Sequence, residues 1–200
     1  MLKEIFFVIS CYIVGSVPFG YIAGKLRGID IRTQGSGNIG STNVSRVLGR
    51  KTGIAVQILD IAKGILPVLV GKYLGLSPSW LVTGGLIAIC GHNWTIFLGF
   101  KGGKGVNTSL GVALGLMPLN ASLCFVVWII AVLIWKYISL GSVLAAITFP
   151  ILAFVYNYPL IYKIMAVIVA LFIVVRHRAN IKRIIDGTEP KIGKNKVRST

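Results

Sequence analysis

The stretch VNTSLGVALGLMPLNASLCFVVWIIAVLIW, residues 106 to 135, decides how this chain folds, because it is apolar throughout yet interrupted near its middle. A helix needs only about 20 residues to cross the hydrocarbon core of a bilayer. The interruption is Met117-Pro118-Leu119-Asn120, and a helix is expected to end and turn at such a Pro and Asn pair. The stretch therefore forms either one long membrane span or a hairpin of two.

Apolar stretches also run over residues 5–23, 53–71, 80–100, 138–156 and 159–175. The chain is 55% hydrophobic and only 13% charged, whereas an average soluble domain carries about 25% charged residues. It is therefore a polytopic membrane protein. The first stretch is a retained span, because polar and basic residues follow it where a signal-peptide cleavage site would be expected.

The distribution of Lys and Arg favours seven spans over six, because cytoplasmic loops carry the excess of these residues. Seven spans with the N-terminus outside place 17 of the 21 on the cytoplasmic side and three outside, with Lys63 inside a span. Six spans divide the same residues into nine and 11. The cytoplasmic residues are Lys25, Arg27, Arg32, Arg46, Arg50, Lys51, Lys101, Lys104, Lys136, Arg176, Arg178, Lys182, Arg183, Lys191, Lys194, Lys196 and Arg198.

The predicted fold is all-α, with seven transmembrane helices over residues 1–190, the C-terminus in the cytoplasm and a short fourth helix. That helix, residues 106–117, is roughly 18 Å long, too short for a core of about 30 Å. Either the bilayer thins there or the glycine-rich loop before the helix dips into the membrane, as in transporters with broken helices. Residues 191–200 form a basic tail near anionic lipid.

Three polar elements follow the expected spans on the cytoplasmic side. The first is GSGNIGSTNVSR, residues 35–46, whose glycines expose backbone N–H groups to an oxyanion. Its G-x-G-x-x-G spacing does not indicate a dinucleotide site, because membrane spans flank it in place of a βαβ unit. The alternative is a flexible polar connector. Its candidate substrate-binding residues are Ser36, Asn38, Thr42, Asn43 and Arg46.

The second element, FKGGKGVNTS at residues 100–109, leads directly into the short helix. Gly102, Gly103 and Gly105 surround Lys104, so bare backbone amides, a cation and a helix N-terminus are expected to converge. This arrangement predicts a phosphate cradle. It is not a Walker A loop, because Leu98 stands at the first glycine position and Gly105 at the Ser or Thr position. A basic turn that obeys the positive-inside rule is the alternative.

The third element is RHRANIKRIIDGTE, residues 176–189. If it is helical, His177, Asn180 and Arg183 lie on one face and present an imidazole, an amide and a guanidinium to an anion, with Gly187 as the stop. A histidine that is only a bystander at the membrane surface is the alternative.

Inside the second span, Asp60 and Lys63 are three residues apart. Charges at that depth are costly unless paired, so we expect a salt bridge with a structural or orienting role. His92-Asn93-Trp94, in the third span, lines the same cavity or forms hydrogen bonds between helices.

Neither a metal nor a cofactor is expected. The cysteines lack metal-site or disulfide spacing, and His92 and His177 are the only histidines. The basic charge calls for an anionic partner such as a lipid headgroup or a phosphorylated metabolite. Nucleic acid is excluded because the four tryptophans lie within or at the ends of spans and are not interleaved with the basic residues.

The set GSGNIGSTNVSR, FKGGKGV and HRANIKRIIDGTE, with Asp60-Ile61-Ala62-Lys63-Gly64 in the second span, resembles the bacterial acyl-phosphate:glycerol-3-phosphate acyltransferases known as PlsY. The resemblance covers essentially the whole chain. It implies transfer of a fatty acyl group from acyl phosphate to the 1-hydroxyl of glycerol 3-phosphate, giving lysophosphatidic acid and phosphate, as the first step of phospholipid synthesis. It also implies a multi-pass protein of the bacterial inner membrane with a cytoplasmic active site. We expect a monomer with membrane lipid around it.

The resemblance further implies roles for single residues. Ser36 and Arg46 would be essential, and Gly102, Gly103 and Gly105 would form the glycerol-3-phosphate loop. His177 and Asn180 would support activity, with Glu189 structural and Ser142 a further contact.

The residues themselves fit this chemistry. An acyl phosphate has a good leaving group, so an enzyme mainly has to align the reactants and stabilise the oxyanion, which Lys104 and backbone amides can do. No convincing nucleophile–base arrangement is present, so direct transfer is favoured over an acyl-enzyme. His177 or a substrate phosphate could accept the proton. A transporter or channel for a phosphorylated anion is the rival function, but the outer loops are short and nearly featureless.

Overall fold

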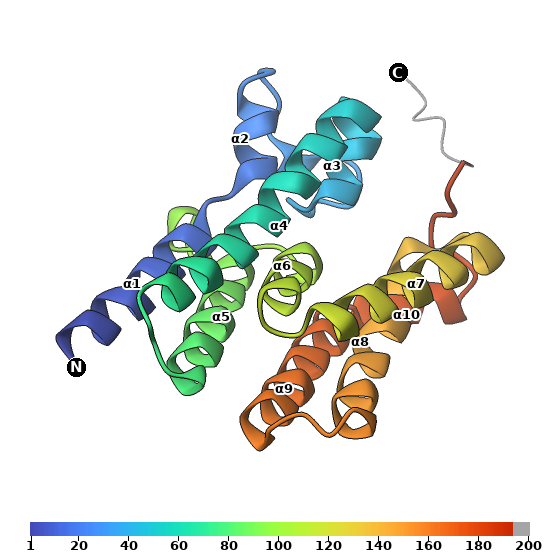
Figure 1. Ribbon diagram of the computed structural model, residues 1–200. Coiled ribbons are helices and arrows are strands. Elements are labelled where there is room, and N and C mark those ends of the chain that lie inside the picture. The colour runs from blue at the N-terminus through green and yellow to red at the C-terminus, as the bar shows by residue number, and fades with distance from the viewer. Residues whose placement is uncertain (194–200) are drawn as a thin grey trace. The chain divides into compact units, whose positions relative to one another are not determined.

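The computed structural model describes residues 1–193, and within them every regular element is helical (Figure 1). Residues 194–200 of the expected basic tail lie outside the described residues. The chain divides into two compact units, Met1–Leu116 and the part from Met117 onward.

The first unit begins with a broken helix, α1 (Leu2–Ser16) and α2 (Phe19–Lys25), interrupted at Val17-Pro18. Pro18 has no N–H to continue the helical hydrogen bonds. The remaining elements of this unit are η1 (Ile31–Thr33), α3 (Ser41–Leu48), α4 (Arg50–Tyr73), α5 (Pro78–Asn93), η2 (Ile96–Leu98) and α6 (Val106–Leu116).

The second unit consists of α7 (Pro118–Trp135), α8 (Ile138–Val155), α9 (Leu160–Arg176) and the short α10 (Arg178–Ile185). α8 packs against both α7 and α9. α9 and α10 meet at His177 with a bend of 55°. Residues 178–185 of the third polar element are therefore helical, which meets the condition set for its three-residue spacing, and Gly187 follows the end of α10 with a φ of +69°.

Each predicted apolar stretch contains a helix. By length and composition, five segments of the described chain could cross a membrane: 2–25, 50–73, 78–98, 118–135 and 138–155. α9 qualifies only together with α10, and α6 has just 11 residues. The stretch 106–135 is two helices separated at Met117, so a short helix is present where one was predicted.

Small residues let the helices of the first unit approach closely. α4 packs most extensively on α6, and α1 on α5. A methyl group at Gly64 of α4 would collide with the Thr108 carbonyl of α6, and one at Gly111 would collide with the Ile61 carbonyl. Such small-residue contacts replace the hydrophobic driving force that helices lack in lipid.

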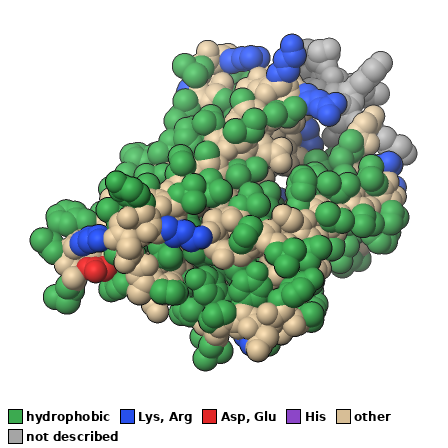
Figure 2. Space-filling model, in the orientation of Figure 1, with side chains coloured by type: hydrophobic (Ala, Val, Ile, Leu, Met, Phe, Trp, Pro, Cys, Tyr) green, Lys and Arg blue, Asp and Glu red, His purple; other side chains and the backbone are tan. Residues whose placement is uncertain are grey.

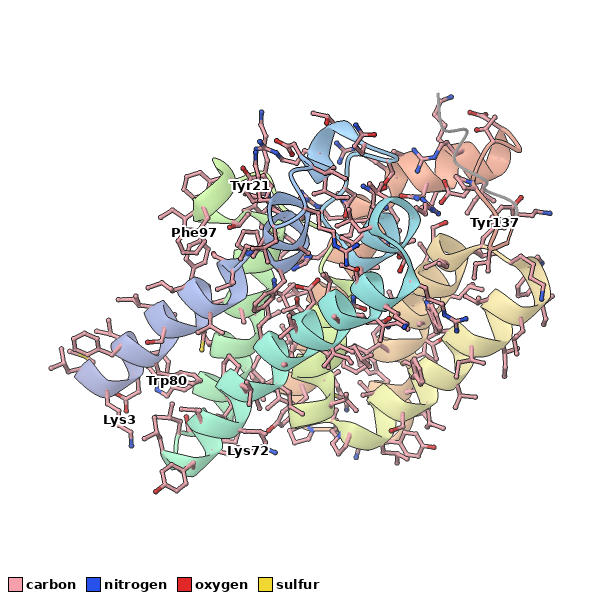
Figure 3. The ribbon with its side chains drawn as sticks, turned by 90° about the horizontal axis from the view of Figure 1, so that it is seen from above. Lys3, Tyr21, Lys72, Trp80, Phe97 and Tyr137 are labelled. Carbon is pink, nitrogen blue, oxygen red and sulfur yellow. The ribbon has the colours of Figure 1, made fainter. Side chains whose placement is uncertain are left out.

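The two ends of the first unit differ in charge. Figure 3 shows Lys3, Lys72 and Trp80 near one end, where Lys3 donates to the Leu74 carbonyl, and Tyr21 and Phe97 near the other. In Figure 2, Lys and Arg gather over α2, α3 and the start of α4, whereas apolar side chains cover most of the visible surface. α2, α3 and the glycine-rich loops lie at the basic end.

Candidate active site

The first polar element is only partly a loop. Its second half belongs to a helix, because Ser41–Leu48 forms α3, with the extended Gly40 as its N-cap. Val44 and Leu48 are buried in a small core with Ile31 and Ile39. These apolar positions at a four-residue spacing give the helix its packed face. Thr42 and Arg46 are consequently partly buried residues of α3, whereas Ser36 is exposed on the loop before it.

Asn43 organises this loop. Its side-chain amide donates to the carbonyls of Ile31 (3.3 Å) and Gln34 (3.0 Å), and its Oδ1 accepts the N–H of Ser36 at 2.8 Å. The residue is only 2% exposed. These contacts use most of its hydrogen-bonding capacity. We therefore assign Asn43 to shaping the loop, which differs from the substrate contact expected from the sequence.

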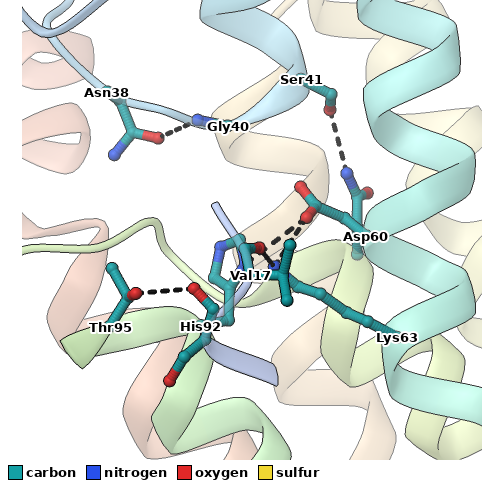
Figure 4. Close-up of polar contacts among 10 residues, drawn as sticks. Val17, Asn38, Gly40, Ser41, Asp60, Lys63, His92 and Thr95 are labelled. Carbon is teal, nitrogen blue, oxygen red and sulfur yellow. Dashed lines mark hydrogen bonds and ion pairs between the residues drawn. The ribbon is translucent and has the colours of Figure 1, made fainter. Parts of the chain in front are cut away.

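Asn38 also acts locally, since its Oδ1 accepts the N–H of Gly40 at 2.8 Å (Figure 4).

The glycine loop lies against the C-terminal end of α5. Gly102 N–H donates to the Asn93 carbonyl at 3.2 Å and Gly103 N–H to the His92 carbonyl at 3.0 Å. The last carbonyls of a helix lack partners within it, so the loop satisfies two of them. The expectation that both amides are bare for phosphate was wrong. The glycines permit close approach, because a methyl group at Gly103 would overlap the His92 ring.

The first and second polar elements meet at the N-termini of two helices. Asn107, in the first turn of α6, donates to the hydroxyl of Ser41, the first residue of α3, at 2.9 Å (Figure 4). The first N–H groups of each helix have no intrahelical acceptor, and the helix dipoles add positive potential. With Lys104 in the adjoining loop, this end of the first unit is suited to hold a phosphate.

The predicted salt bridge between Asp60 and Lys63 is confirmed. Lys63 Nζ lies 2.8 Å from Asp60 Oδ1 and also donates to the Val17 carbonyl at 2.8 Å, where α1 is interrupted (Figure 4). His92 Nδ1 lies 3.7 Å from the same carboxylate oxygen. All three side chains are at least nine-tenths buried.

An apolar groove of about 330 Å³ opens beside this cluster. It is lined by Val17, Pro18, Tyr21, Ile22, Phe97 and Leu98. Lys25 and Arg32 lie over the Tyr21 ring, with Nζ 5.6 Å and Cζ 4.8 Å from its centroid. The groove therefore has apolar walls and a cationic rim. One wall continues through η1 into the first loop, and the other continues from η2 into the glycine loop.

The second unit holds the third element around Glu189. One carboxylate oxygen accepts from Ser139 Oγ (2.7 Å) and Asn180 Nδ2 (2.6 Å), and the other accepts from Arg183 Nε (2.7 Å). Burial raises the pKa of Glu189, but the hydrogen bonds from Ser139, Asn180 and Arg183 outweigh it and hold the pKa below the usual range. The structural role expected for Glu189 agrees with these contacts.

His177 and Ser142 are also held within the second unit. His177 Nδ1 lies 2.8 Å from the Ile173 carbonyl. A carbonyl can only accept, so Nδ1 carries the proton and the ring is fixed in orientation. Ser142 Oγ donates to the Ile138 carbonyl of its own helix at 3.0 Å. The serine that contacts Glu189 is Ser139, which the sequence analysis missed. Its one sequence signal is its position three residues before Ser142 in SLGS.

Comparisons with known proteins give the family of this chain. A family model described as glycerol-3-phosphate acyltransferase matches residues 5–187. Relatives with that name include one from Geobacter sulfurreducens, 48% identical over 94% of this chain and 97% of its own, and one from Aquifex aeolicus, 44% identical over 94% and 98%.

Two solved structures of PlsY, an integral membrane glycerol 3-phosphate acyltransferase, are similar to the chain at 42% identity and cover 96% of both chains. The glycerol 3-phosphate form gives a TM-score of 0.92 and the lysophosphatidic acid form 0.89. By sequence and by fold, this chain belongs to the glycerol-3-phosphate acyltransferase family of integral membrane proteins.

Proposed function

We propose that the chain transfers a fatty acyl group from acyl phosphate to the 1-hydroxyl of glycerol 3-phosphate, releasing lysophosphatidic acid and inorganic phosphate. The observation that carries this proposal is the convergence of the α3 and α6 N-termini, joined by Asn107 and Ser41, next to Lys104. This site is electropositive and rich in N–H donors, as a phosphorylated substrate requires. The acceptor and the product agree with the two forms in which the similar PlsY was solved.

In the proposed reaction, the acceptor hydroxyl oxygen attacks the acyl carbonyl carbon. The bond between that carbon and the bridging phosphate oxygen breaks, and the phosphate leaves with the bonding electrons. Lys104 and the helix N-termini stabilise the negative charge that develops. The proton of the hydroxyl passes to a substrate phosphate, because a phosphate monoester with a second pKa near 6 is mostly dianionic at neutral pH.

The remaining site residues bind and orient. Ser36, Thr42 and Arg46 would contact substrate from the first loop and α3, while Asn38 and Asn43 shape that loop. Glu189 holds Asn180 and Arg183 in fixed orientations and so supports their role with the acceptor. Ser142 would contribute a further contact from α8.

The donor's acyl chain would lie in the apolar groove at the α1–α2 interruption, because both groove walls lead into the loops assigned to phosphate and its rim carries cations. Phe97→Ala should raise the KM of a long-chain acyl phosphate more than that of a short-chain one, because less apolar surface contacts the chain. An equal change for both chain lengths would contradict this placement.

We also propose seven spans in the bacterial inner membrane, with the basic end in the cytoplasm. The gathering of Lys and Arg over α2, α3 and the start of α4 supports this orientation (Figure 2).

The test of the function is an assay of purified protein in lipidic medium with glycerol 3-phosphate. Acyl phosphate, acyl-CoA and acyl carrier protein are offered separately. Lysophosphatidic acid should form only from acyl phosphate, with one phosphate released per acyl group. Product from acyl-CoA at an equal or higher rate would refute the proposed donor. Uptake of glycerol 3-phosphate into vesicles without acylation would instead indicate a transporter.

A further inference from the structure

The buried charges of α4 have no role in the reaction as described. Asp60 is 2% exposed and Lys63 is 3% exposed. A buried ion pair usually contributes no more stability than a well-packed apolar pair of similar size. Membrane-buried ionisable groups are a functional hypothesis by default.

The imidazole of His92 lies between the carboxylate of Asp60 and the glycine loop. Asp60 Oδ1 lies 3.7 Å from His92 Nδ1, on one edge of the imidazole. The opposite edge, at Nε2, lies against Gly103, where a methyl group would overlap the ring. The backbone carbonyl of His92 also accepts the Gly103 N–H at 3.0 Å. The imidazole therefore separates the buried carboxylate from the glycine loop, and its position sets where Gly103 lies.

The same cluster fixes the end of α1. Lys63 donates to the Val17 carbonyl, and Thr95 Oγ donates to the Ser16 carbonyl at 2.6 Å (Figure 4). The Ser16 carbonyl ends an interrupted helix and has no intrahelical donor, whereas the Val17 carbonyl also accepts the Phe19 N–H at 3.2 Å. Thr95 follows His92 by three residues, so α1, α4 and the end of α5 are joined at one level, directly under the glycine loop.

We infer that Asp60 and His92 are positioning residues for glycerol 3-phosphate, with Asp60 acting on the glycine loop through the imidazole of His92. This inference rests on the proposed function and on the assignment of the glycine loop to glycerol 3-phosphate that the family resemblance implies. Misplacement of a binding group by about 1 Å can cost about 100-fold in rate. Loosening this support should therefore raise the glycerol-3-phosphate KM by about tenfold or more, with little change in the donor KM.

The experiment is a double-mutant cycle on purified protein, reading both KM values, kcat and thermal unfolding. One arm is His92→Gln. The other is Asp60→Asn with Lys63→Met, which removes both charges together and leaves no unpaired buried charge. If Asp60 acts through His92, the triple variant should have the same glycerol-3-phosphate KM as the worse arm. If the factors by which the two arms raise the glycerol-3-phosphate KM multiply in the triple variant, Asp60 and His92 contribute independently, and the inference is overturned.

Two further variants keep the result interpretable. Thr83→Val, on the same helix α5, removes a hydroxyl that donates only to the Ser79 carbonyl at 2.9 Å, and it should leave both KM values unchanged. Lys104→Ala tests the loop assignment itself. If Lys104→Ala leaves catalysis intact, the proposed function of the loop fails. If Lys104→Ala is impaired while both arms keep a wild-type KM for glycerol 3-phosphate, only the positioning inference fails.

A loss of stability alone must also be recognised. If an arm does not fold, His92→Asn replaces His92→Gln, because its amide stands near the Nδ1 position and keeps a polar group facing Asp60. A rise in both KM values in parallel with a lower unfolding temperature would show a general structural role and would overturn the inference.

Discussion

Lys104 lies between Gly103 and Gly105 in the loop next to the α6 N-terminus. Lys104→Ala should lower kcat/KM for acyl transfer by at least about 100-fold, the usual cost of removing one group that stabilises the transition-state charge. Lys101→Ala is the matched control, since it removes an equal charge from an exposed position one residue before the three glycines. Near wild-type turnover of the Lys104 variant, with an unchanged unfolding temperature, would remove this lysine from the mechanism.

His177 distinguishes a positioning role from general-base catalysis. Because its Nδ1 donates to the Ile173 carbonyl, His177→Asn can keep a donor near that position, whereas His177→Ala cannot. Positioning predicts graded losses, with Asn retaining more activity than Ala. General-base catalysis predicts equal losses of about 10²- to 10⁴-fold. The measurement is kcat at saturating substrate over several pH values. Equal losses, together with disappearance of an ionisation near pH 6.5, would contradict the transfer of the proton to a substrate phosphate.

At the scale of single elements, the sequence predicted the features that depend on neighbouring residues, namely where helices form and where they break. The apolar stretches contain the long helices, and Pro118 marked the break between α6 and α7. That the third polar element contains a helix was only a condition in the sequence analysis, and α10 meets it. The sequence did not predict contacts between distant segments. The sequence shows that the loop has glycines but not that their amides meet the end of α5, and nothing local distinguishes Asn43 or Ser139 as a structural partner.

The attachment of α10 to α8 should depend on pH through Glu189. The Glu189 carboxylate accepts hydrogen bonds from Ser139 of α8 and Asn180 of α10. Its pKa in the folded protein lies below the ordinary value of about 4.3. The stabilisation from ionised Glu189 is therefore fully present above the unfolded-state pKa and is lost as the pH falls through the lower folded-state pKa. Glu189→Gln should lower the unfolding temperature at pH 7. The difference in unfolding temperature between the variant and wild type should become smaller as the pH falls.

Asp186→Asn is the control for this prediction, because it removes another carboxylate from the same segment. Among the described residues, the Asp186 carboxylate forms an ion pair only with the exposed Lys182, 3.5 Å away. Exposed pairs contribute about 0–1 kcal/mol. The Asp186 variant should therefore unfold near the wild-type temperature at pH 7. A gap in unfolding temperature between wild type and Glu189→Gln that stays constant through the whole acid titration of the carboxylate would show that the ionised carboxylate is not what holds α10.

At the scale of the whole molecule, the proposed orientation of the chain rests on where its basic residues fall, and it depends on whether the short α6 counts as a crossing of its own. If α6 and α7 count as two crossings, the basic α10 lies on the same side of the membrane as α2 and α3. If they form one crossing, α10 lies on the opposite side, and the bias required by the positive-inside rule disappears.

Single cysteines at exposed positions, in a background lacking Cys11, Cys90 and Cys124, separate these topologies. Leu26→Cys and Tyr73→Cys mark the two ends of the first unit, and Asn157→Cys and Lys182→Cys those of the second. With seven spans, a membrane-impermeant maleimide should label Tyr73→Cys and Asn157→Cys in intact spheroplasts, and should label Leu26→Cys and Lys182→Cys only after permeabilisation. Six spans predict that Asn157→Cys and Lys182→Cys exchange behaviour while the first pair does not. That exchange would place the third polar element outside the cell, away from the compartment that supplies the phosphorylated acceptor, and would overturn the proposed cytoplasmic reaction.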